Sequence, residues 1–145
     1  MKILVLCTGN SCRSQMAEGF LRYYLNKKGL TGAACNVRSA GTEPSGLNPY
    51  AVKVMQETGV DISGQASKSV RQFTDQTFDY IITVCDHAAD NCPVFPGEGI
   101  RFHWPFEDPA GAAGTEEEIL IKFRRVRDEI ETRIRHWLML EPELR

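Results

Sequence analysis

The chain has 145 residues, a length typical of one domain, and its 17 basic and 19 acidic side chains leave a net charge of −2 at pH 7. Lys and Arg nowhere form the cluster expected of a nucleic-acid binder, and no apolar run is long enough to cross a membrane. We therefore expect a single domain over residues 1–145 that is a monomer and binds neither nucleic acid nor a membrane.

Strand and helix patterns alternate from one end of the chain to the other. Short apolar runs predict four strands, at residues 3–6, 36–39, 80–84 and 100–103. Helical patterns are found at residues 14–27, at residues 67–73, and at residues 49–58, where a proline stands first. This alternation predicts an α/β fold, with a four-stranded parallel sheet, right-handed crossovers and helices on both faces.

A final helix has the clearest pattern in the sequence. Thr115 is its expected N-cap, glutamates fill its first turn, and apolar residues follow at spacings of three and four. Three arginines within residues 124–127 could form a docking patch on this helix. Acidic partners four residues further on, such as Asp128 and Glu131, favour a solvated face with salt bridges instead.

The most informative segment is the one in which Cys7 and Arg13 enclose five residues, between a predicted strand and a predicted helix. A strand, a tight loop and a helix start together direct backbone N–H groups and the positive helix end at an anion. A thiol in such surroundings ionises readily, so we expect Cys7 to be a thiolate nucleophile. Arg13 adds a planar pair of donors that fits two oxygens of a phosphate-like oxyanion.

The whole loop is expected to take part in oxyanion binding. Gly9 allows a positive φ and a close approach to the anion, and Asn10 tolerates left-handed geometry. Ser14 can direct its hydroxyl at the Cys7 sulfur or cap the helix. Cys12 is more typical of a packing residue than of a second reactive thiol. The candidate oxyanion-binding residues are Thr8, Gly9, Asn10, Ser11, Cys12, Arg13 and Ser14.

The remaining cysteines point to redox chemistry. Five cysteines, an odd number, without a recognisable signal peptide indicate a reducing cytoplasm, where thiols are reactive rather than structural. Cys85 follows a predicted strand, as Cys7 does, so both are expected at the sheet edge where α/β folds bind ligands. Cys85 and Cys92 can pair only if their α-carbons come within about 7 Å, which requires a short helix over residues 86–91 to loosen. Cys35 is expected in the core.

A zinc site is the alternative interpretation of the same region, with Cys85, His87, Cys92 and His103 as ligands. Their spacing fits none of the common zinc patterns, in which ligands pair about two to four residues apart in two clusters. We therefore expect no metal and no other cofactor, and we interpret both histidines as surface or packing residues.

Three separated strings together resemble the thioredoxin-coupled arsenate reductases, which share the fold of the low-molecular-weight protein tyrosine phosphatases. They are CTGNSCRSQMAEG at residues 7–19, VCDHAADNCP at residues 84–93 and HWPFEDPA at residues 103–110. The resemblance extends from Ile3 to about Trp137. It implies that arsenate is reduced to arsenite by a relay of three cysteines, and that thioredoxin recycles the thiols.

The resemblance also implies roles for individual residues. Cys7 would attack arsenate while Arg13 and the loop hold its oxygens, and Asp108 would protonate the departing oxygen. Cys85 would then attack the Cys7 sulfur and release arsenite, and Cys92 would attack Cys85 to leave a Cys85–Cys92 disulfide. An acid of this kind needs apolar surroundings. The neighbours that could supply them are Trp104, Pro105, Phe106 and Pro109.

One departure from the family concerns a potassium ion that such relatives often bind beside the anion loop. Asn10, Glu18 and Ser39 match positions associated with it, but Lys68 stands where an acidic ligand would be expected. An ammonium group could fill the same electrostatic role, so no metal is predicted there.

Two other functions remain open. A low-molecular-weight tyrosine phosphatase would use Cys7, Arg13 and Asp108 to hydrolyse phosphotyrosine through a phosphocysteine intermediate. Against it, the small residues Ala110 and Gly111 stand where such phosphatases usually have aromatic residues, and hydrolysis needs no further cysteine. The other alternative is a non-catalytic module that binds anions and signals through oxidation of Cys7.

Overall fold

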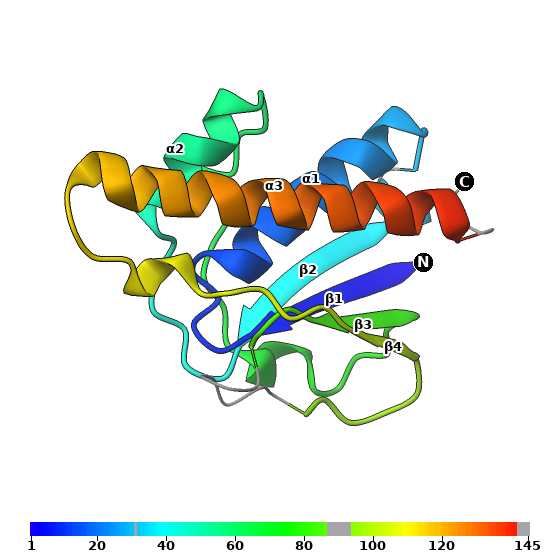
Figure 1. The fold of residues 1–145 in the computed structure, drawn as a ribbon. Helices are drawn as coiled ribbons and strands as arrows, with labels where there is room; N and C mark the ends of the chain where they lie inside the picture. The colour runs from blue at the N-terminus through cyan, green and yellow to red at the C-terminus, as the bar shows by residue number, and fades with distance from the viewer. Residues whose placement is uncertain (31, 87–93, 142–145) are drawn as a thin grey trace.

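The four expected strands form one sheet in a computed structural model of the chain, which describes residues 1–30, 32–86 and 94–141. The strands are parallel and follow the order β2-β1-β3-β4 (Figure 1). Their bounds are Lys2–Cys7 for β1, Asn36–Gly41 for β2, Tyr80–Thr83 for β3 and Ile100–His103 for β4. The predicted α/β fold with a four-stranded parallel sheet is thus confirmed.

Helices cover both faces of the sheet, but unevenly. The three α-helices share one face, above the strands in Figure 1; they are α1 (Arg13–Lys27), α2 (Pro49–Glu57) and α3 (Glu116–Leu140). Three one-turn 3₁₀ helices complete the described elements, namely η1 (Gly32–Ala34), η2 (Val70–Phe73) and η3 (Pro109–Gly111). Of these, η2 packs on the opposite face of the sheet. The helix predicted over residues 67–73 is therefore only this single turn.

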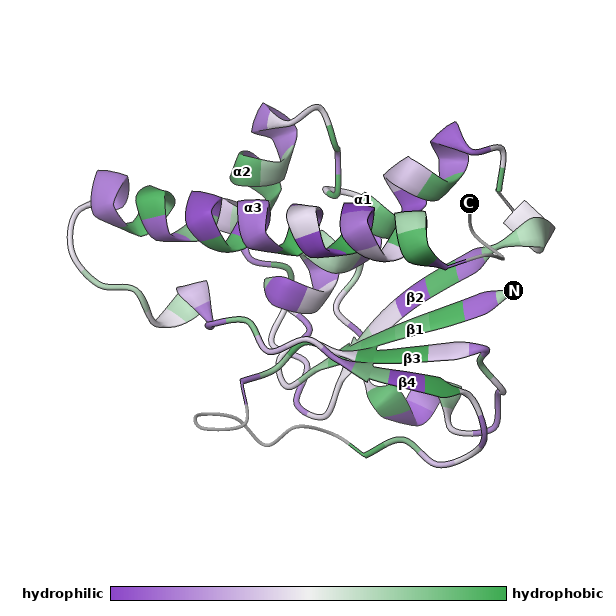
Figure 2. Cartoon of the chain, turned by 45° about the vertical axis from the view of Figure 1, so that its right-hand side comes forward, coloured by the Kyte–Doolittle hydropathy of each residue, from purple (hydrophilic) through white to green (hydrophobic). Residues whose placement is uncertain are grey.

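β1 is the centre of the fold because its side chains are apolar on both faces. Ile3 and Val5 join the core beneath the three α-helices, whereas Leu4 and Leu6 join a smaller core with Phe73 of η2. All four β1 side chains are fully buried, as expected of a central strand in a parallel sheet. Figure 2 shows β1 as hydrophobic over most of its length. Burial at about 1.5–3 kcal/mol per side chain fixes the strand, and with it the position of Cys7 at its end.

α3 closes the larger core. Thr115 Oγ1 accepts from the N–H of Glu118 at 3.2 Å, and Glu118 accepts from the N–H of Thr115 at 3.3 Å, so a capping box begins the helix. Near its other end, Trp137 packs edge-on against Tyr80 of β3, with ring centroids 5.1 Å apart. The predicted N-cap is confirmed, and the helix continues to Leu140.

The arginines of α3 form salt bridges, as expected, and some of their partners come from outside the helix. Arg124 and Arg127 both reach Glu57 at the end of α2, at 2.9 and 2.8 Å. Glu131, expected as a partner of this face, instead accepts from the hydroxyl of Tyr24 on α1. Tertiary packing therefore adds acidic partners from neighbouring elements to those within α3, where Arg127 pairs with Asp128 at 2.8 Å and Arg125 with Glu129 at 3.8 Å.

Among the described residues, no helix is both long and apolar enough to span a membrane.

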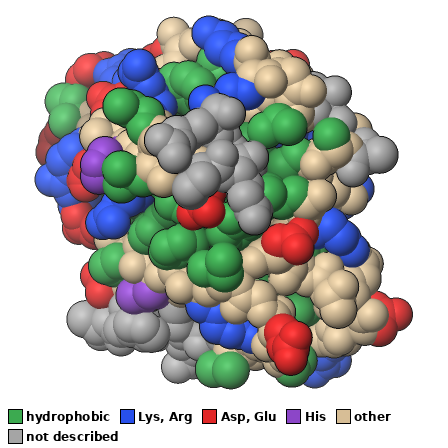
Figure 3. Space-filling view, turned by 90° about the vertical axis from the view of Figure 1, so that its right-hand side faces the viewer, with side chains coloured by type: hydrophobic (Ala, Val, Ile, Leu, Met, Phe, Trp, Pro, Cys, Tyr) green, Lys and Arg blue, Asp and Glu red, His purple; other side chains and the backbone are tan. Residues whose placement is uncertain are grey.

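Hydrophobic side chains gather on the face shown in Figure 3, which looks onto the ends of the strands where β1 begins. The C-terminal end of α3 lies at this end of the molecule, and its Met139 and Leu140 are 68% and 64% exposed.

Glu57 allows a test of the salt bridges between α2 and α3. The hydrogen bond from Arg124 holds the pKa of Glu57 below its usual range. A lowered pKa means that the carboxylate stabilises the fold above its unfolded-state pKa, and that this stabilisation is lost as the pH falls through the folded-state value. Glu57→Gln should therefore lower the free energy of unfolding by about 1 kcal/mol at neutral pH, and by a smaller amount near pH ~3. Urea denaturation at both pH values measures this.

The matched control for this substitution is Glu129→Gln, which removes a longer contact of 3.8 Å with Arg125. It should change the free energy of unfolding by less than about 0.5 kcal/mol. A deficit for Glu57→Gln that is the same at both pH values would contradict an origin in the charge of Glu57.

Candidate active site

A cavity of about 270 Å³ opens at the carboxyl end of the sheet, where β1 leads into α1. This is the edge at which parallel α/β sheets bind ligands. It brings the predicted nucleophile, the predicted guanidinium and the predicted acid together. The residues that line it are Cys7, Thr8, Gly9, Ser11, Cys12, Arg13, Glu43, Ser45, Asp108 and Ala110.

The loop between β1 and α1 presents N–H groups to this cavity because its carbonyl groups are bonded on the other side. The carbonyl oxygens of Thr8, Gly9 and Ser11 each accept a backbone N–H from the segment at residues 43–48, at 2.9 to 3.1 Å. In a planar trans peptide the C=O and N–H bonds point in opposite directions, so these peptide units turn their N–H groups inward. The first N–H groups of α1 also lack intrahelical partners. Together they suit a tetrahedral oxyanion.

Arg13 is held firmly at the first position of α1. Its side chain is 3% exposed, and Nη1 donates to the carbonyl oxygen of Phe106 at 3.0 Å. Nη2 lies 3.6 Å from Oδ2 of Asp108, while Oδ1 of Asp108 accepts from the N–H of Ala110 at 3.0 Å. The segment that contains Phe106 and Asp108 therefore fixes the direction of the guanidinium group.

Asp108 lies at the exposed side of the cavity rather than among apolar side chains. Its side chain is 42% exposed, whereas Trp104 and Phe106 bury their rings in the larger core. The carboxyl group therefore lacks the apolar surroundings that were expected. Its neighbours Trp104 and Phe106 point into the protein, whereas Asp108 points out of it. The carboxyl group is therefore in contact with solvent while it also lines the cavity.

Asn10 fixes the loop from behind. It is fully buried and, with a φ of 46°, is the only residue other than glycine with positive φ among those that the structure describes. Its Nδ2 donates to the hydroxyls of Ser14 and Ser39 at 2.8 and 2.9 Å. Its Oδ1 accepts from Gln15 Nε2 at 3.1 Å and from the N–H of Lys68 at 2.7 Å. These bonds hold the left-handed conformation predicted for Asn10, and neither Asn10 nor Ser14 lines the cavity.

Two glycines allow other segments to approach the loop. Gly9 was expected at positive φ, but within the loop only Asn10 adopts it. A Cβ at Gly9 would instead lie 2.9 Å from Ser45 Oγ, and one at Gly41, the last residue of β2, would lie 2.3 Å from the carbonyl oxygen of Thr8. The sequence interpretation missed Gly41. A glycine that ends a strand beside the loop-bearing strand is the signal that could have identified it.

Burial decides which thiols can react. It raises the pKa of Cys12 to about 12, which keeps this thiol protonated although it lines the cavity. Burial also raises the pKa of Cys35, which packs in the core as predicted. Cys7, Cys12 and Cys35 carry reduced thiols. Cys12 is therefore a packing residue, and its backbone is the N-cap of α1, the place considered for Ser14.

Cys85 lies beside the end of β1. The ladder between β1 and β3 ends with Leu6 opposite Thr83, and the N–H of Val84 still donates to the carbonyl oxygen of Leu6 at 3.0 Å. Cys85 is the next residue. It therefore reaches the same edge of the sheet as Cys7, on the adjacent strand.

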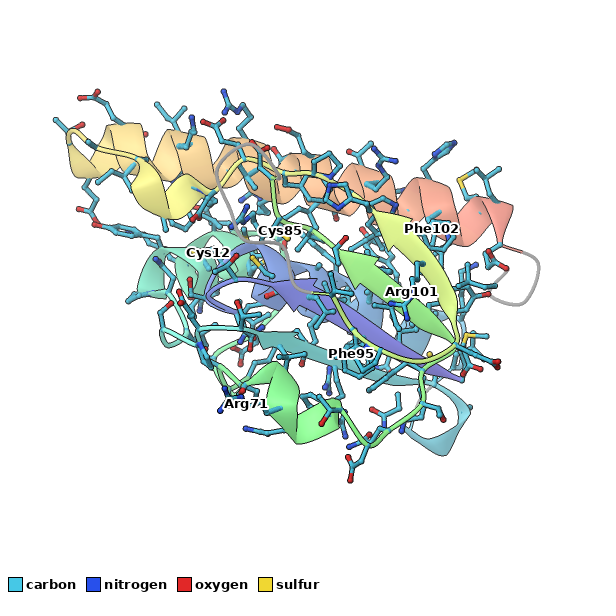
Figure 4. The ribbon with its side chains drawn as sticks, turned by 90° about the horizontal axis from the view of Figure 1, so that it is seen from below. Cys12, Arg71, Cys85, Phe95, Arg101 and Phe102 are labelled. Atoms are coloured by element: carbon cyan, nitrogen blue, oxygen red, sulfur yellow. The ribbon has the colours of Figure 1, made fainter. Side chains whose placement is uncertain are left out.

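Cys85 is also buried and oxidised. It is fully buried, it shares the larger core with Cys7 and Cys12, and it is disulfide-bonded. Figure 4 shows Cys85 at the same end of the sheet as Cys12. Cys92 lies outside the described residues, as does nearly all of the helix predicted over residues 86–91.

The residues considered above for a potassium ion do not fit it. Lys68 brings its ammonium group to 3.8 Å from Glu18 Oε1 and donates to the carbonyl oxygen of Ala66 at 2.5 Å. The hydroxyl of Ser39 donates to the same Glu18 oxygen, and Arg22 pairs with the other one at 2.9 Å. Glu18 already has two cationic partners, and the ammonium group would repel a potassium ion at this place.

Among the described residues, no three His, Cys, Asp or Glu side chains are gathered around a common point. Of the four ligands considered for zinc, His87 and Cys92 lie outside the described part of the chain. His103 is exposed at the end of β4, where its Nδ1 lies 2.7 Å from the hydroxyl oxygen of Thr83.

Known arsenate reductases are similar to this chain in sequence and in structure. The arsenate reductase of Halalkalibacterium halodurans is 53% identical over 133 residues, which are 92% of this chain and 91% of that protein. A solved arsenate reductase in the phosphate-binding state has a TM-score of 0.75 and 35% identity, over 94% of this chain and 95% of its own. A thioredoxin-dependent arsenate reductase of Corynebacterium glutamicum has a TM-score of 0.65 and 28% identity, over 96% of this chain and 60% of its own.

The sequence pattern of one protein family covers almost the whole chain. The family described as low molecular weight phosphotyrosine protein phosphatase matches residues 2–144. This match includes the loop that follows β1, the oxidised cysteine after β3 and the acidic residue at the cavity. The chain therefore belongs to the low molecular weight phosphotyrosine protein phosphatase family.

Proposed function

We propose that this chain reduces arsenate to arsenite through a relay of three cysteines, Cys7, Cys85 and Cys92. The observation that carries the proposal is Cys85, which is disulfide-bonded beside the end of β1 while Cys7 holds a reduced thiol at the cavity. Hydrolysis requires only the cavity, whereas a redox-active cysteine next to the nucleophile serves electron transfer. The similarity to proteins named arsenate reductases supports the same substrate.

The cavity supplies what an arsenate dianion requires. Arg13 offers two coplanar N–H donors, and the loop offers N–H groups that converge on one point. Cys7 stands at the end of β1, where its sulfur can attack arsenic once the oxyanion lies in the loop. Asp108, which lies 3.6 Å from Arg13, is the proposed donor of a proton to the oxygen that leaves as water.

Two electrons would pass from sulfur to arsenic by successive thiolate attacks. Cys7 forms a sulfur–arsenic bond, and one protonated arsenate oxygen leaves as water. Cys85 then attacks the Cys7 sulfur, the sulfur–arsenic bond breaks with its electron pair on arsenic, and arsenite leaves. Cys92 finally attacks the Cys85 sulfur, which releases the Cys7 thiolate and leaves a Cys85–Cys92 disulfide. An oxidised Cys85 together with a reduced Cys7 agrees with this last stage.

The proposed reductant is a dithiol protein of the thioredoxin class, since the final disulfide must be opened by thiol exchange. The relative named thioredoxin-dependent arsenate reductase supports this choice. We assign the reaction to the cytoplasm, because that compartment keeps such dithiols reduced. The relay needs no cofactor, since the electrons travel through sulfur alone, and one copy of the chain carries all of its residues.

Hydrolysis of aryl phosphates is the second candidate, because the family is named for it and the cavity holds Cys7, Arg13 and Asp108 together. The described residues that line the cavity include no aromatic side chain, so a tyrosine ring would find no apolar wall there. We therefore propose phosphate-ester hydrolysis as a weak side activity. It serves as a control reaction because it does not involve Cys85.

The division of labour between the two loop cysteines can be tested directly. Cys7→Ser should lower both arsenate reduction and aryl phosphate hydrolysis by about 10³-fold or more, because the nucleophile of both reactions is lost. Cys12→Ala should leave both rates within about threefold, since burial keeps that thiol protonated. Arsenite formation with thioredoxin, thioredoxin reductase and NADPH measures the first reaction. A folded Cys12→Ala protein without activity would refute this assignment.

The relay itself is tested at Cys85. Cys85→Ser should abolish repeated turnover of arsenate while aryl phosphate hydrolysis stays within about threefold of the unaltered protein, because only electron transfer requires the second thiol. Cys35→Ser is the matched control, since it removes another buried cysteine without touching the relay. Unchanged arsenate turnover in Cys85→Ser would reject the proposed mechanism.

A further inference from the structure

Lys68 occupies an unusual place for a lysine. Its side chain is only 18% exposed, and its ammonium group lies beside Glu18, whose carboxylate is 3% exposed. Burial lowers the pKa of Lys68, while the carboxylate of Glu18 opposes this change. A buried ion pair stabilises a fold only weakly, because desolvation offsets the attraction. A role in positioning other groups is therefore the more informative explanation.

A continuous series of contacts links this ammonium group to the anion loop. Lys68 Nζ lies 3.8 Å from Glu18 Oε1, which accepts the hydroxyl of Ser39 at 2.5 Å. The oxygen of Ser39 in turn accepts from Asn10 Nδ2 at 2.9 Å. Asn10 is the left-handed residue on which the shape of the loop depends. The positive charge at one end of the series thus faces the same Glu18 oxygen that accepts the hydroxyl of Ser39, so the ammonium group, Glu18 and Ser39 orient one another.

We infer that Lys68 supplies from within the chain the monovalent positive charge that supports the anion loop, so that oxyanion binding does not depend on potassium. Lys68 is a positioning residue, because it acts through Glu18, Ser39 and Asn10 and does not line the cavity. Arg22 cannot replace it, since Arg22 is 47% exposed and binds Oε2 of Glu18 instead of Oε1. The inference rests on the oxyanion-binding step of the proposed function and not on the thiol relay.

Binding of inorganic phosphate to the unaltered protein tests the first part of the inference. Isothermal titration calorimetry in about 0.1 M KCl and in the same concentration of choline chloride compares a small cation with a bulky one at constant screening. The two dissociation constants should agree within about twofold, because the ammonium group needs no ion from solution. A larger difference would overturn the inference and leave the proposed function intact. An absence of phosphate binding in both salts would overturn both.

Substitution of Lys68 tests the second part. Lys68→Met keeps much of the length of the side chain and removes its charge, so the phosphate dissociation constant should rise about fivefold to tenfold. Lys68→Arg, which keeps the charge, should stay within about threefold of the unaltered protein. Lys28→Met is the matched control, because Lys28 is exposed and lies at the far end of α1 from the loop.

Three results of the substitution experiment would overturn the inference. A folded Lys68→Met protein whose dissociation constant rises by less than about threefold, or equal losses in the Met and Arg variants, would overturn it. So would an equal loss in Lys28→Met, since that would indicate a general effect of net charge. Circular dichroism establishes that each variant is folded, and the comparison of salts on the unaltered protein decides the matter if Lys68→Met is not.

Discussion

Three backbone carbonyl groups that are bonded away from the cavity decide what this site can bind. Thr8, Gly9 and Ser11 give their oxygens to the segment at residues 43–48, and the N–H groups of the same peptide units are left to face an anion. If that segment moved away, carbonyl oxygens could rotate inward, where they would repel the same anion. Gly41 and Asn10 serve this arrangement, the first by allowing β2 to approach and the second by accepting a left-handed backbone.

The surroundings that the fold builds also explain why Cys7 and Cys12, two cysteines of one loop, are assigned different roles. Cys7 and Cys12 both line the cavity and belong to the larger core, but burial raises the pKa of Cys12 and so disfavours its thiolate. Sequence distance has little to do with this difference. In the proposed relay Cys7 is the nucleophile, and the fold places Cys85 just after the neighbouring strand, at the same edge of the sheet.

Elements with strong local patterns could be predicted from the sequence, and so could the loop. The apolar strand at residues 3–6 and the capped helix α3 are decided by residues close together in the chain. The loop between β1 and α1 has a recognisable local motif, although its shape also depends on the segment at residues 43–48. The conformation of residues 67–73 depends instead on distant residues. The backbone of Lys68 is hydrogen-bonded to Asn10 and Gly41, so only the residues that follow it form a single 3₁₀ turn. Tertiary contacts override a weak local preference there.

Side-chain environments were less predictable, because they depend on pairs that only the fold brings together. Trp104 and Phe106 stand close to Asp108 in sequence, yet their rings turn into the core while the carboxyl group turns toward Arg13. Arg124 and Arg127 share Glu57 on another helix as a partner, which no spacing within α3 could have indicated. The role of Gly41 likewise exists only when β2 lies beside β1.

The topology of the sheet affects the order in which the protein can fold. Ile3 pairs with Val37 on one side and with Tyr80 on the other, so each neighbour of the first strand must arrive from much later in the chain. Parallel pairings of this kind cannot start from a hairpin and are slow to form. The hydrogen bond that orients Arg13 forms later still, because its acceptor is the carbonyl group of Phe106. During synthesis on the ribosome, Cys7 is therefore present long before the sheet and the Arg13 contact that complete the oxyanion site can form. The site becomes able to bind an oxyanion only after most of the chain has been made.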